Sequence, residues 1–149
     1  MKRSGSIRKP PSRWISRGVL LLAILSSLAT MAASPAPDAA ERAANAWLKL
    51  VDEGKYVQSW QAASSYFRSQ VTEADWVGTI ASLRQALGGL AARDLASSRT
   101  ATSLPGAPDG NYVVIEYHTS FTNKRSATET VIMMLGKDGR YRIAGYFIR

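Results

Sequence analysis

The chain has 149 residues, of which 46% are hydrophobic, contains no cysteine and carries a formal net charge of +8. Without cysteine it can form no disulfide and no lipidated N-terminal cysteine, so we expect the core alone to hold the fold. Residues 1–33 hold six of the 19 basic residues and none of the 11 acidic ones, which leaves a net charge of +2 on the remainder. So small a charge excludes the basic surface that DNA or RNA binding requires.

Residues 1–33 have the three-part layout of a secretory signal peptide. The basic residues that precede the apolar run are Lys2, Arg3, Arg8, Lys9, Arg13 and Arg17. The apolar run Val19–Leu28 follows, and then the small-residue segment Ala29–Ser34. We therefore expect cleavage after Ala32 or Ala33 and a periplasmic or secreted protein.

The alternative for this segment is an uncleaved membrane anchor. Twenty uncharged residues separate Arg17 from Asp38, about the length that spans a bilayer. Serine, threonine and two prolines interrupt that window, and the apolar part is too short to span. Contact with a membrane is expected only if the segment stays attached.

Residues 34–38 are predicted to be a short linker, and a single domain is expected over residues 39–149. A first helix is predicted over residues 39–53, where Asp38 offers an N-cap and Gly54 a C-terminal stop. Its apolar residues recur at helical spacing: Ala40, Ala44, Trp47, Leu48 and Val51.

Two further helices are predicted before the period changes. Tyr56, Trp60, Ala63 and Phe67 fall on one face of a second helix, which two serines at 64 and 65 are expected to kink. The third helix begins with a capping box formed by Thr72 and Asp75 and ends at the glycines 88 and 89. Its apolar face holds Trp76, Ile80, Leu83 and Leu87, with Arg84 expected on another face.

From residue 91 onward the pattern alternates and predicts four strands. They cover residues 93–103, 112–121, 127–135 and 141–148, separated by turn-forming segments rich in glycine, proline, asparagine and aspartate. Short connections between consecutive strands indicate an antiparallel meander. We therefore predict an α+β fold with three N-terminal helices packed on one face of a curved four-stranded antiparallel sheet.

The alternation also predicts which face of the sheet is buried. In the second strand Val113, Ile115, Tyr117, Thr119 and Phe121 share the expected core face, and Glu116 and His118 lie on the other. The last two strands are apolar on both faces, so helices on one face leave an apolar patch: Val131, Met133, Leu135, Tyr146 and Ile148, or their alternates. Because large exposed apolar patches are rare on monomers, we predict a homodimer through the outer sheet face.

Several short motifs resemble a bacterial exported family known as domain of unknown function 4019. They are Tyr56-Val-Gln-Ser-Trp60, Leu104-Pro-Gly106, Asp109-Gly-Asn-Tyr112, Glu129-Thr130 and Gly145-Tyr-Phe-Ile-Arg149. The resemblance covers residues 39–149, and Tyr141 stands where the family would have tryptophan. It implies a shape similar to the cystatin-like and nuclear-transport-factor-2-like group, and it transfers no catalytic role.

No catalytic constellation, metal site or cofactor motif is predicted. His118 is the only histidine and shares its strand face with Glu116, which supplies two metal ligands at most. Trp60, Trp76, Glu116 and His118 are the candidate ligand-binding residues, because cone-shaped α+β folds often enclose an apolar cavity.

Two functional hypotheses follow from the sequence. The first is an exported, non-enzymatic domain that binds a small apolar ligand or an envelope protein. The alternative is a small cone-fold enzyme that uses a carboxylate in an apolar cavity, with Asp75, Glu116 and His118 as its candidate residues.

Overall fold

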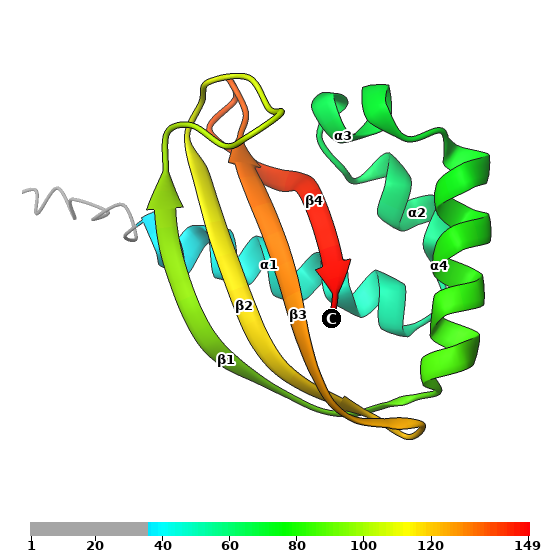
Figure 1. The fold of residues 1–149 in the computed structure, drawn as a ribbon. Coiled ribbons are helices and arrows are strands. Elements are labelled where there is room, and N and C mark those ends of the chain that lie inside the picture. Colours follow the sequence, from blue (N-terminus) through cyan, green and yellow to red (C-terminus); the bar gives the residue numbers. More distant parts are fainter. Residues whose placement is uncertain (1–35) are drawn as a thin grey trace, which may run out of the picture. The chain divides into compact units, whose positions relative to one another are not determined.

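The structure of the protein is a computed structural model and describes residues 36–149 (Figure 1). The helices are α1 (Ala36–Asp52), α2 (Tyr56–Gln61), α3 (Ser65–Gln70) and α4 (Glu73–Leu87), and the strands are β1 (Leu90–Ala101), β2 (Tyr112–Phe121), β3 (Lys124–Leu135) and β4 (Tyr141–Ile148). This order confirms the predicted α+β class. The predicted signal peptide lies outside the described residues. No helix of the described part is both long and apolar enough to cross a membrane.

The first helix begins earlier than predicted. α1 starts at Ala36, so Pro37 and Asp38 belong to its first turn and not to a linker. Proline suits this position because its fixed φ is helical and its missing N–H would have no partner there. The acidic Asp38 in the same turn is favourable beside the positive end of the helix dipole.

The predicted second helix is two short helices, which raises the helix count to four. The break lies at Ser64, whose backbone is extended (φ −63°, ψ 156°) and whose hydroxyl accepts a hydrogen bond from the Phe67 N–H at 3.1 Å. Ser64 therefore caps a new helix and does not kink an existing one. Its own N–H donates to the Ile143 carbonyl at 2.9 Å, which joins the start of α3 to β4.

The limits of α4 agree with its sequence signals. Thr72 is the N-cap and accepts a hydrogen bond from the Asp75 N–H at 3.2 Å. Gly88 ends the helix at φ +77°, and a Cβ there would come within 2.0 Å of the Thr122 hydroxyl. Glycine is therefore required at the turn from α4 into β1.

The sheet is a four-stranded antiparallel meander in the order β1-β2-β3-β4. β1 carries two bulges against β2, at Ala91 and Ala96, and β4 carries one against β3, at Ala144. Figure 1 shows the sheet curving around α1, which contacts all four strands. α4 packs against α2 and stands beside β4 at one edge of the sheet.

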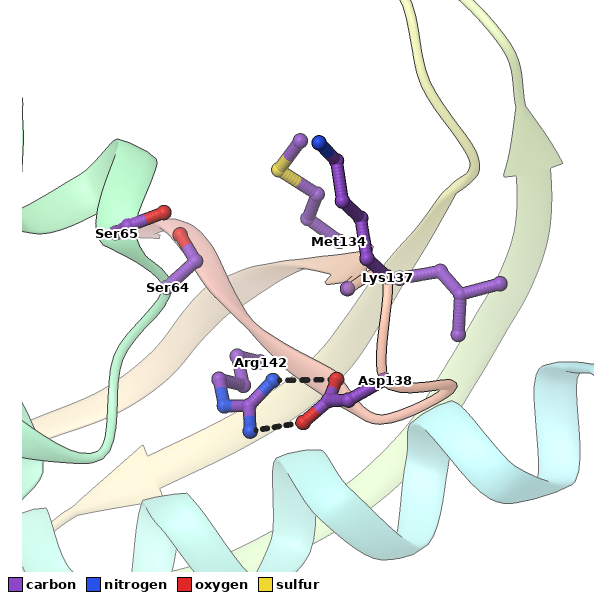
Figure 2. A pocket seen from close by; sticks show the side chains of 8 residues that line it. Ser64, Ser65, Met134, Lys137, Asp138 and Arg142 are labelled. Atoms are coloured by element: carbon purple, nitrogen blue, oxygen red, sulfur yellow. Dashed lines mark hydrogen bonds and ion pairs between the residues drawn. The ribbon is translucent and has the colours of Figure 1, made fainter.

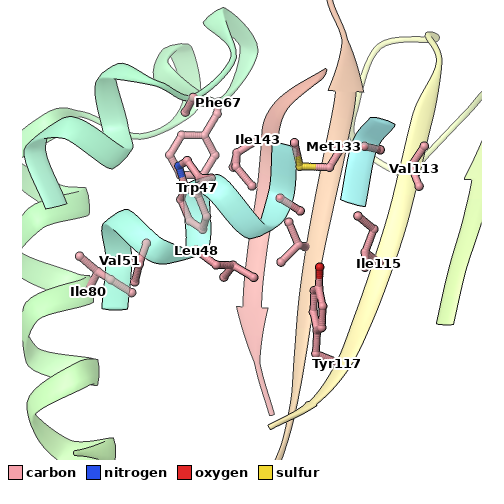
Figure 3. Packing of buried hydrophobic residues seen from close by; sticks show 14 of the residues in the cluster. Trp47, Leu48, Val51, Phe67, Ile80, Val113, Ile115, Tyr117, Met133 and Ile143 are labelled. Carbon is pink, nitrogen blue, oxygen red and sulfur yellow. The ribbon is translucent and has the colours of Figure 1, made fainter. Parts of the chain in front are cut away.

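The core lies between α1 and the concave face of the sheet (Figure 3). The five apolar residues of the α1 stripe are all buried, which confirms the helical pattern. The predicted core face of β2 is also buried from Val113 to Phe121. Val131, Met133 and Tyr146 belong to this core side, so the outward-facing set is the alternate one.

The outer face of the sheet is partly covered by the chain itself. The loop after β1 folds back so that the Tyr112 hydroxyl donates to the Pro108 carbonyl at 2.6 Å, and Tyr112 is 1% exposed. Farther along this face Ile132 and Met134 are half-buried, and Phe147 is 54% exposed. Phe147 is therefore the most exposed apolar residue of the predicted patch on this face.

Candidate functional site

The candidate site is a groove between α3, α4 and the free edge of β4, which we call the aromatic groove. Its volume is about 480 Å³, within the usual range for ligand sites. The lining residues are Tyr66, Phe67, Gln70 and Val71 from one side, Asp75, Trp76 and Thr79 from α4, and Ala144, Gly145, Tyr146 and Phe147 from β4.

Aromatic rings in edge-to-face contact form the floor of the aromatic groove. The centroid of the Trp76 ring lies 5.3 Å from that of Phe67, 6.1 Å from that of Tyr146 and 5.7 Å from that of Trp47. Edge-to-face contacts at such distances are favourable for aromatic pairs. The floor is therefore formed by aromatic rings of α3, α4 and β4, and Trp47 of α1 packs behind it without lining the groove.

Ser59 holds two of these rings in place. The Trp76 Nε1–H donates to its hydroxyl at 2.9 Å, and the Trp47 Nε1–H donates to its carbonyl at 2.8 Å. The Ser59 hydroxyl in turn donates to the Tyr56 carbonyl at 2.7 Å. Because both indole groups have partners, the floor is preorganised and loses little rotational freedom on binding a ligand.

Behind the floor lies a buried ionic network centred on Glu129, which is 0% exposed. Its carboxylate accepts hydrogen bonds from Arg93 Nε at 2.6 Å, from the Thr119 hydroxyl at 3.0 Å and from the Tyr146 hydroxyl. Asp52 bridges the two arginines, at 2.7 Å from Arg93 Nη1 and 2.8 Å from Arg84 Nη2. Two carboxylates and two guanidinium groups thus balance in charge.

This network shifts the pKa values of its members. Burial alone would lower the pKa of Arg93, but its hydrogen bonds to Asp52 and Glu129 raise it. Burial, with the adjacent Glu129 carboxylate, raises the pKa of Tyr146 far above its usual range. The Tyr146 hydroxyl therefore stays protonated and bound to Glu129, and both oxygens of Glu129 have hydrogen-bond donors.

The structure separates the four predicted ligand-binding residues. Trp76 lines the aromatic groove. Trp60 is half-buried outside it, with its Nε1–H on the Val71 carbonyl at 2.8 Å. Glu116 and His118 lie on the outer face of β2, where Glu116 accepts a hydrogen bond from Ser97 at 3.3 Å and His118 is exposed.

The three residues named for the enzymatic alternative, Asp75, Glu116 and His118, do not lie together in one site. Asp75 lines the aromatic groove, and its carboxylate accepts a hydrogen bond from the Thr72 hydroxyl at 2.6 Å. Glu116 and His118 are on the opposite side of the sheet from this groove. Among residues 36–149 no three carboxylate, histidine or cysteine side chains lie close enough to hold a metal ion.

The sequence interpretation missed the ionic network. Arg84 was expected on a face of its helix other than the apolar one, and no partner was predicted for it, but it is 7% exposed and pairs with Asp52 across 32 residues. Glu129 could have been found by its spacing, because it alternates with Ala127 and Val131 on the core face of β3. A carboxylate at such a position must have a buried partner.

Two hollows of comparable volume lie outside the aromatic groove, in addition to smaller ones. The outer hollow, about 430 Å³, lies on the convex face of the sheet between Glu116, Phe147 and Arg149. The hairpin hollow, about 540 Å³, lies between Ser64 and the β3–β4 turn. Figure 2 shows that two of its three charged residues, Asp138 and Arg142, face each other. Their hydrogen bonds are 2.6 and 2.9 Å long. That pairing leaves these two groups with little capacity for a charged ligand.

Comparison with known proteins adds a family and no activity. No curated protein matches the chain. A family model described as Protein of unknown function (DUF4019) matches residues 43–146, from the middle of α1 almost to the end of β4. The match includes every residue that lines the aromatic groove except Phe147. The chain therefore belongs to the DUF4019 family.

Proposed function

We propose that the protein is exported to the periplasm or secreted and acts there, without catalysis, by binding a ligand or partner in the aromatic groove. The observation that carries this proposal is the preorganised floor of Trp76, Phe67 and Tyr146. Open apolar space beside fixed aromatic rings favours the binding of apolar groups.

The engagement of the carboxylates supports a binding role over an enzymatic one. Both oxygens of Glu129 accept hydrogen bonds from neighbouring side chains. General acid–base catalysis needs a carboxyl group within hydrogen-bonding reach of the substrate. Asp75 is the carboxylate that lines the groove, so it would have to serve in the enzymatic alternative.

Export is supported by the basic, apolar and small-residue segments of residues 1–33. Fractionation of expressing cells and N-terminal sequencing of the recovered protein test it. We expect a mature chain that begins at Ala33 or Ser34. The variant Leu22→Arg should block export because it places a charge in the apolar run. Recovery of the intact chain from the cytoplasm would contradict the proposal.

Ligand binding is tested by NMR on the indole Nε1–H of Trp76, with indole and N-acetylphenylalanine amide as probes. We expect a saturable shift of this signal with at least one probe. The variant Thr79→Phe should abolish the shift because it fills the groove from α4. Gln85→Phe is the matched control, since Gln85 is exposed on the same helix and lies outside the groove.

A signal that neither probe moves would contradict binding in the groove. An equal loss of the shift in Thr79→Phe and Gln85→Phe would show that the effect does not come from the groove. Turnover of a hydrolase or isomerase substrate that Asp75→Asn abolishes would favour the enzymatic alternative.

A further inference from the structure

The strand that borders the aromatic groove has one free edge. β4 is the last strand of the sheet and pairs with β3 only. On its other side the Ile143 carbonyl accepts a hydrogen bond from the Ser64 N–H, at the start of α3. Beyond this contact, toward residue 148, no backbone hydrogen bond to the free side of β4 occurs among the described residues.

The register of β3 and β4 shows which backbone groups point outward. Thr128 and Arg149 exchange two hydrogen bonds, at 2.8 and 2.9 Å. In an antiparallel pair such exchanges recur at every second residue, and the N–H and C=O groups between them point away from the partner strand. Tyr146 lies opposite Val131 at one of these intermediate positions. Its backbone N–H and C=O therefore point toward the groove.

The opposite edge of the sheet is protected more strongly than the open stretch of β4. β1 has two bulges, and the charged residues Arg93, Asp94 and Arg99 lie along it. Bulges and charges are the usual means by which proteins prevent an edge strand from pairing. β4 has one bulge, at Ala144, and the open stretch that follows it, Gly145-Tyr146-Phe147, carries no charge.

The walls of the groove restrict what can pair with this edge. Residues of α3 and α4 line the side opposite β4, and Figure 1 shows these helices standing beside the strand. A second folded sheet cannot lie along β4 there without displacing the helices, whereas a single extended segment needs only about 5 Å beside the strand.

The charge of the groove indicates one feature of that segment. Asp75 is the only charged residue among those that line the groove, and the other side chains are mostly apolar or aromatic. A complementary segment would place a basic side chain near Asp75 and apolar side chains over Trp76 and Phe67.

We infer that the groove binds an extended polypeptide segment with one basic residue among apolar ones, which adds to the sheet as a fifth strand along β4. This inference rests on the proposed binding function. In this mode main-chain hydrogen bonds to Tyr146 supply affinity, and alternate side chains in the groove supply specificity.

Three capped peptides of alternating threonine and valine test the inference, with lysine in place of one valine: Thr-Lys-Thr-Val-Thr-Val-Thr, Thr-Val-Thr-Lys-Thr-Val-Thr and Thr-Val-Thr-Val-Thr-Lys-Thr. Binding is followed by NMR at peptide concentrations up to about 1 mM. We expect at least one peptide to shift the Tyr146 amide signal and to slow its hydrogen exchange. Replacing lysine by glutamate should weaken binding at least tenfold.

Backbone methylation of the bound peptide separates strand pairing from simple burial. Amide groups of an extended peptide point alternately toward β4 and away from it. N-methylation of one alternating set should therefore weaken binding at least tenfold, and methylation of the other set less than threefold. Asp75→Asn should remove the preference for lysine over glutamate, and Glu73→Gln, in the same helical turn but outside the groove, should keep it.

Each other outcome overturns the inference. Equal effects of the two methylation patterns would show that the peptide binds without pairing to β4. If indole shifts the NMR signal of the Trp76 indole N–H but no peptide binds, the pairing of a fifth strand with β4 is refuted and the proposed function stands. No binding of either class of probe would refute both.

Discussion

The strongest prediction concerns Arg93, because it neutralises a carboxylate that has no access to solvent. Arg93 donates two hydrogen bonds to Glu129, at 2.6 and 3.1 Å, and two to Asp52, at 2.7 and 3.0 Å. The variant Arg93→Met keeps the apolar stem and removes the charge. Glu129, at 0% exposure, then keeps only the hydroxyl donors Thr119 and Tyr146.

The expected loss in the free energy of unfolding depends on the partners that Glu129 and Asp52 keep in Arg93→Met. Removing one partner of a buried ion pair leaves an uncompensated charge and typically destabilises a protein by about 3–5 kcal/mol. Asp52 loses less, because it is 20% exposed and retains Arg84 at 2.8 Å. We therefore assign most of the loss in Arg93→Met to Glu129.

Urea unfolding followed by tryptophan fluorescence measures the free energy of unfolding at neutral pH. The matched control is Arg99→Met, because Arg99 is exposed on the same strand; we expect a change within about 0.5 kcal/mol. The double variant Arg93→Met with Glu129→Leu should recover part of the stability, because the buried carboxylate is gone. A loss below about 1 kcal/mol in Arg93→Met would refute the reasoning.

Three further predictions follow from burial and charge. Trp76→Ala should cost about 3–5 kcal/mol in urea melts, and the half-buried Trp60→Ala should cost less, about 2 kcal/mol; the reverse order would contradict the burial of Trp76, which is 7% exposed. Side-chain hydrogen bonds from Lys49 and Lys55 lower the pKa of Glu53 to about 2. Because its pKa is lower in the folded state, Glu53 contributes stability above its unfolded pKa of 4.5, and this contribution is lost as the pH falls toward 2. Glu53→Gln should therefore flatten the pH dependence of the urea midpoint between pH 4.5 and 2. An unchanged pH dependence in this variant would show that solvent fully screens the exposed ion pairs. Light scattering at micromolar concentration should give the mass of a dimer. Phe147→Ser should reduce this mass to that of the monomer, and Val57→Ser, at an exposed site on α2, should leave it unchanged. A monomeric mass for the unmodified protein would contradict pairing through the outer face of the sheet.

Local periodicity was sufficient to predict most of the secondary structure. Alternation predicted β2 and β4 with the bounds that the structure has, and it identified the buried side of β2. Helical spacing identified the buried stripe of α1. These features depend on neighbours a few residues apart, because each strand or helix must bury one apolar face whatever it packs against.

Two local predictions were wrong where a side chain had two options. Ser64 was expected to kink a helix and instead caps α3, since its hydroxyl satisfies the Phe67 N–H. Pro37 was expected in a linker and instead belongs to the first turn of α1. Both residue types are compatible with either structure, so the surrounding packing decided.

By itself, then, the sequence determined the α+β class, the order of helices and strands, and the family motifs. Only the tertiary structure decided the candidate site. The aromatic groove joins α3 and α4 to β4 across about 70 residues of chain, and the Glu129 network joins partners 36 and 41 residues apart. Such contacts follow from strand register and helix placement. All strand pairs and buried faces of the domain determine these together, so no local sequence pattern predicts them.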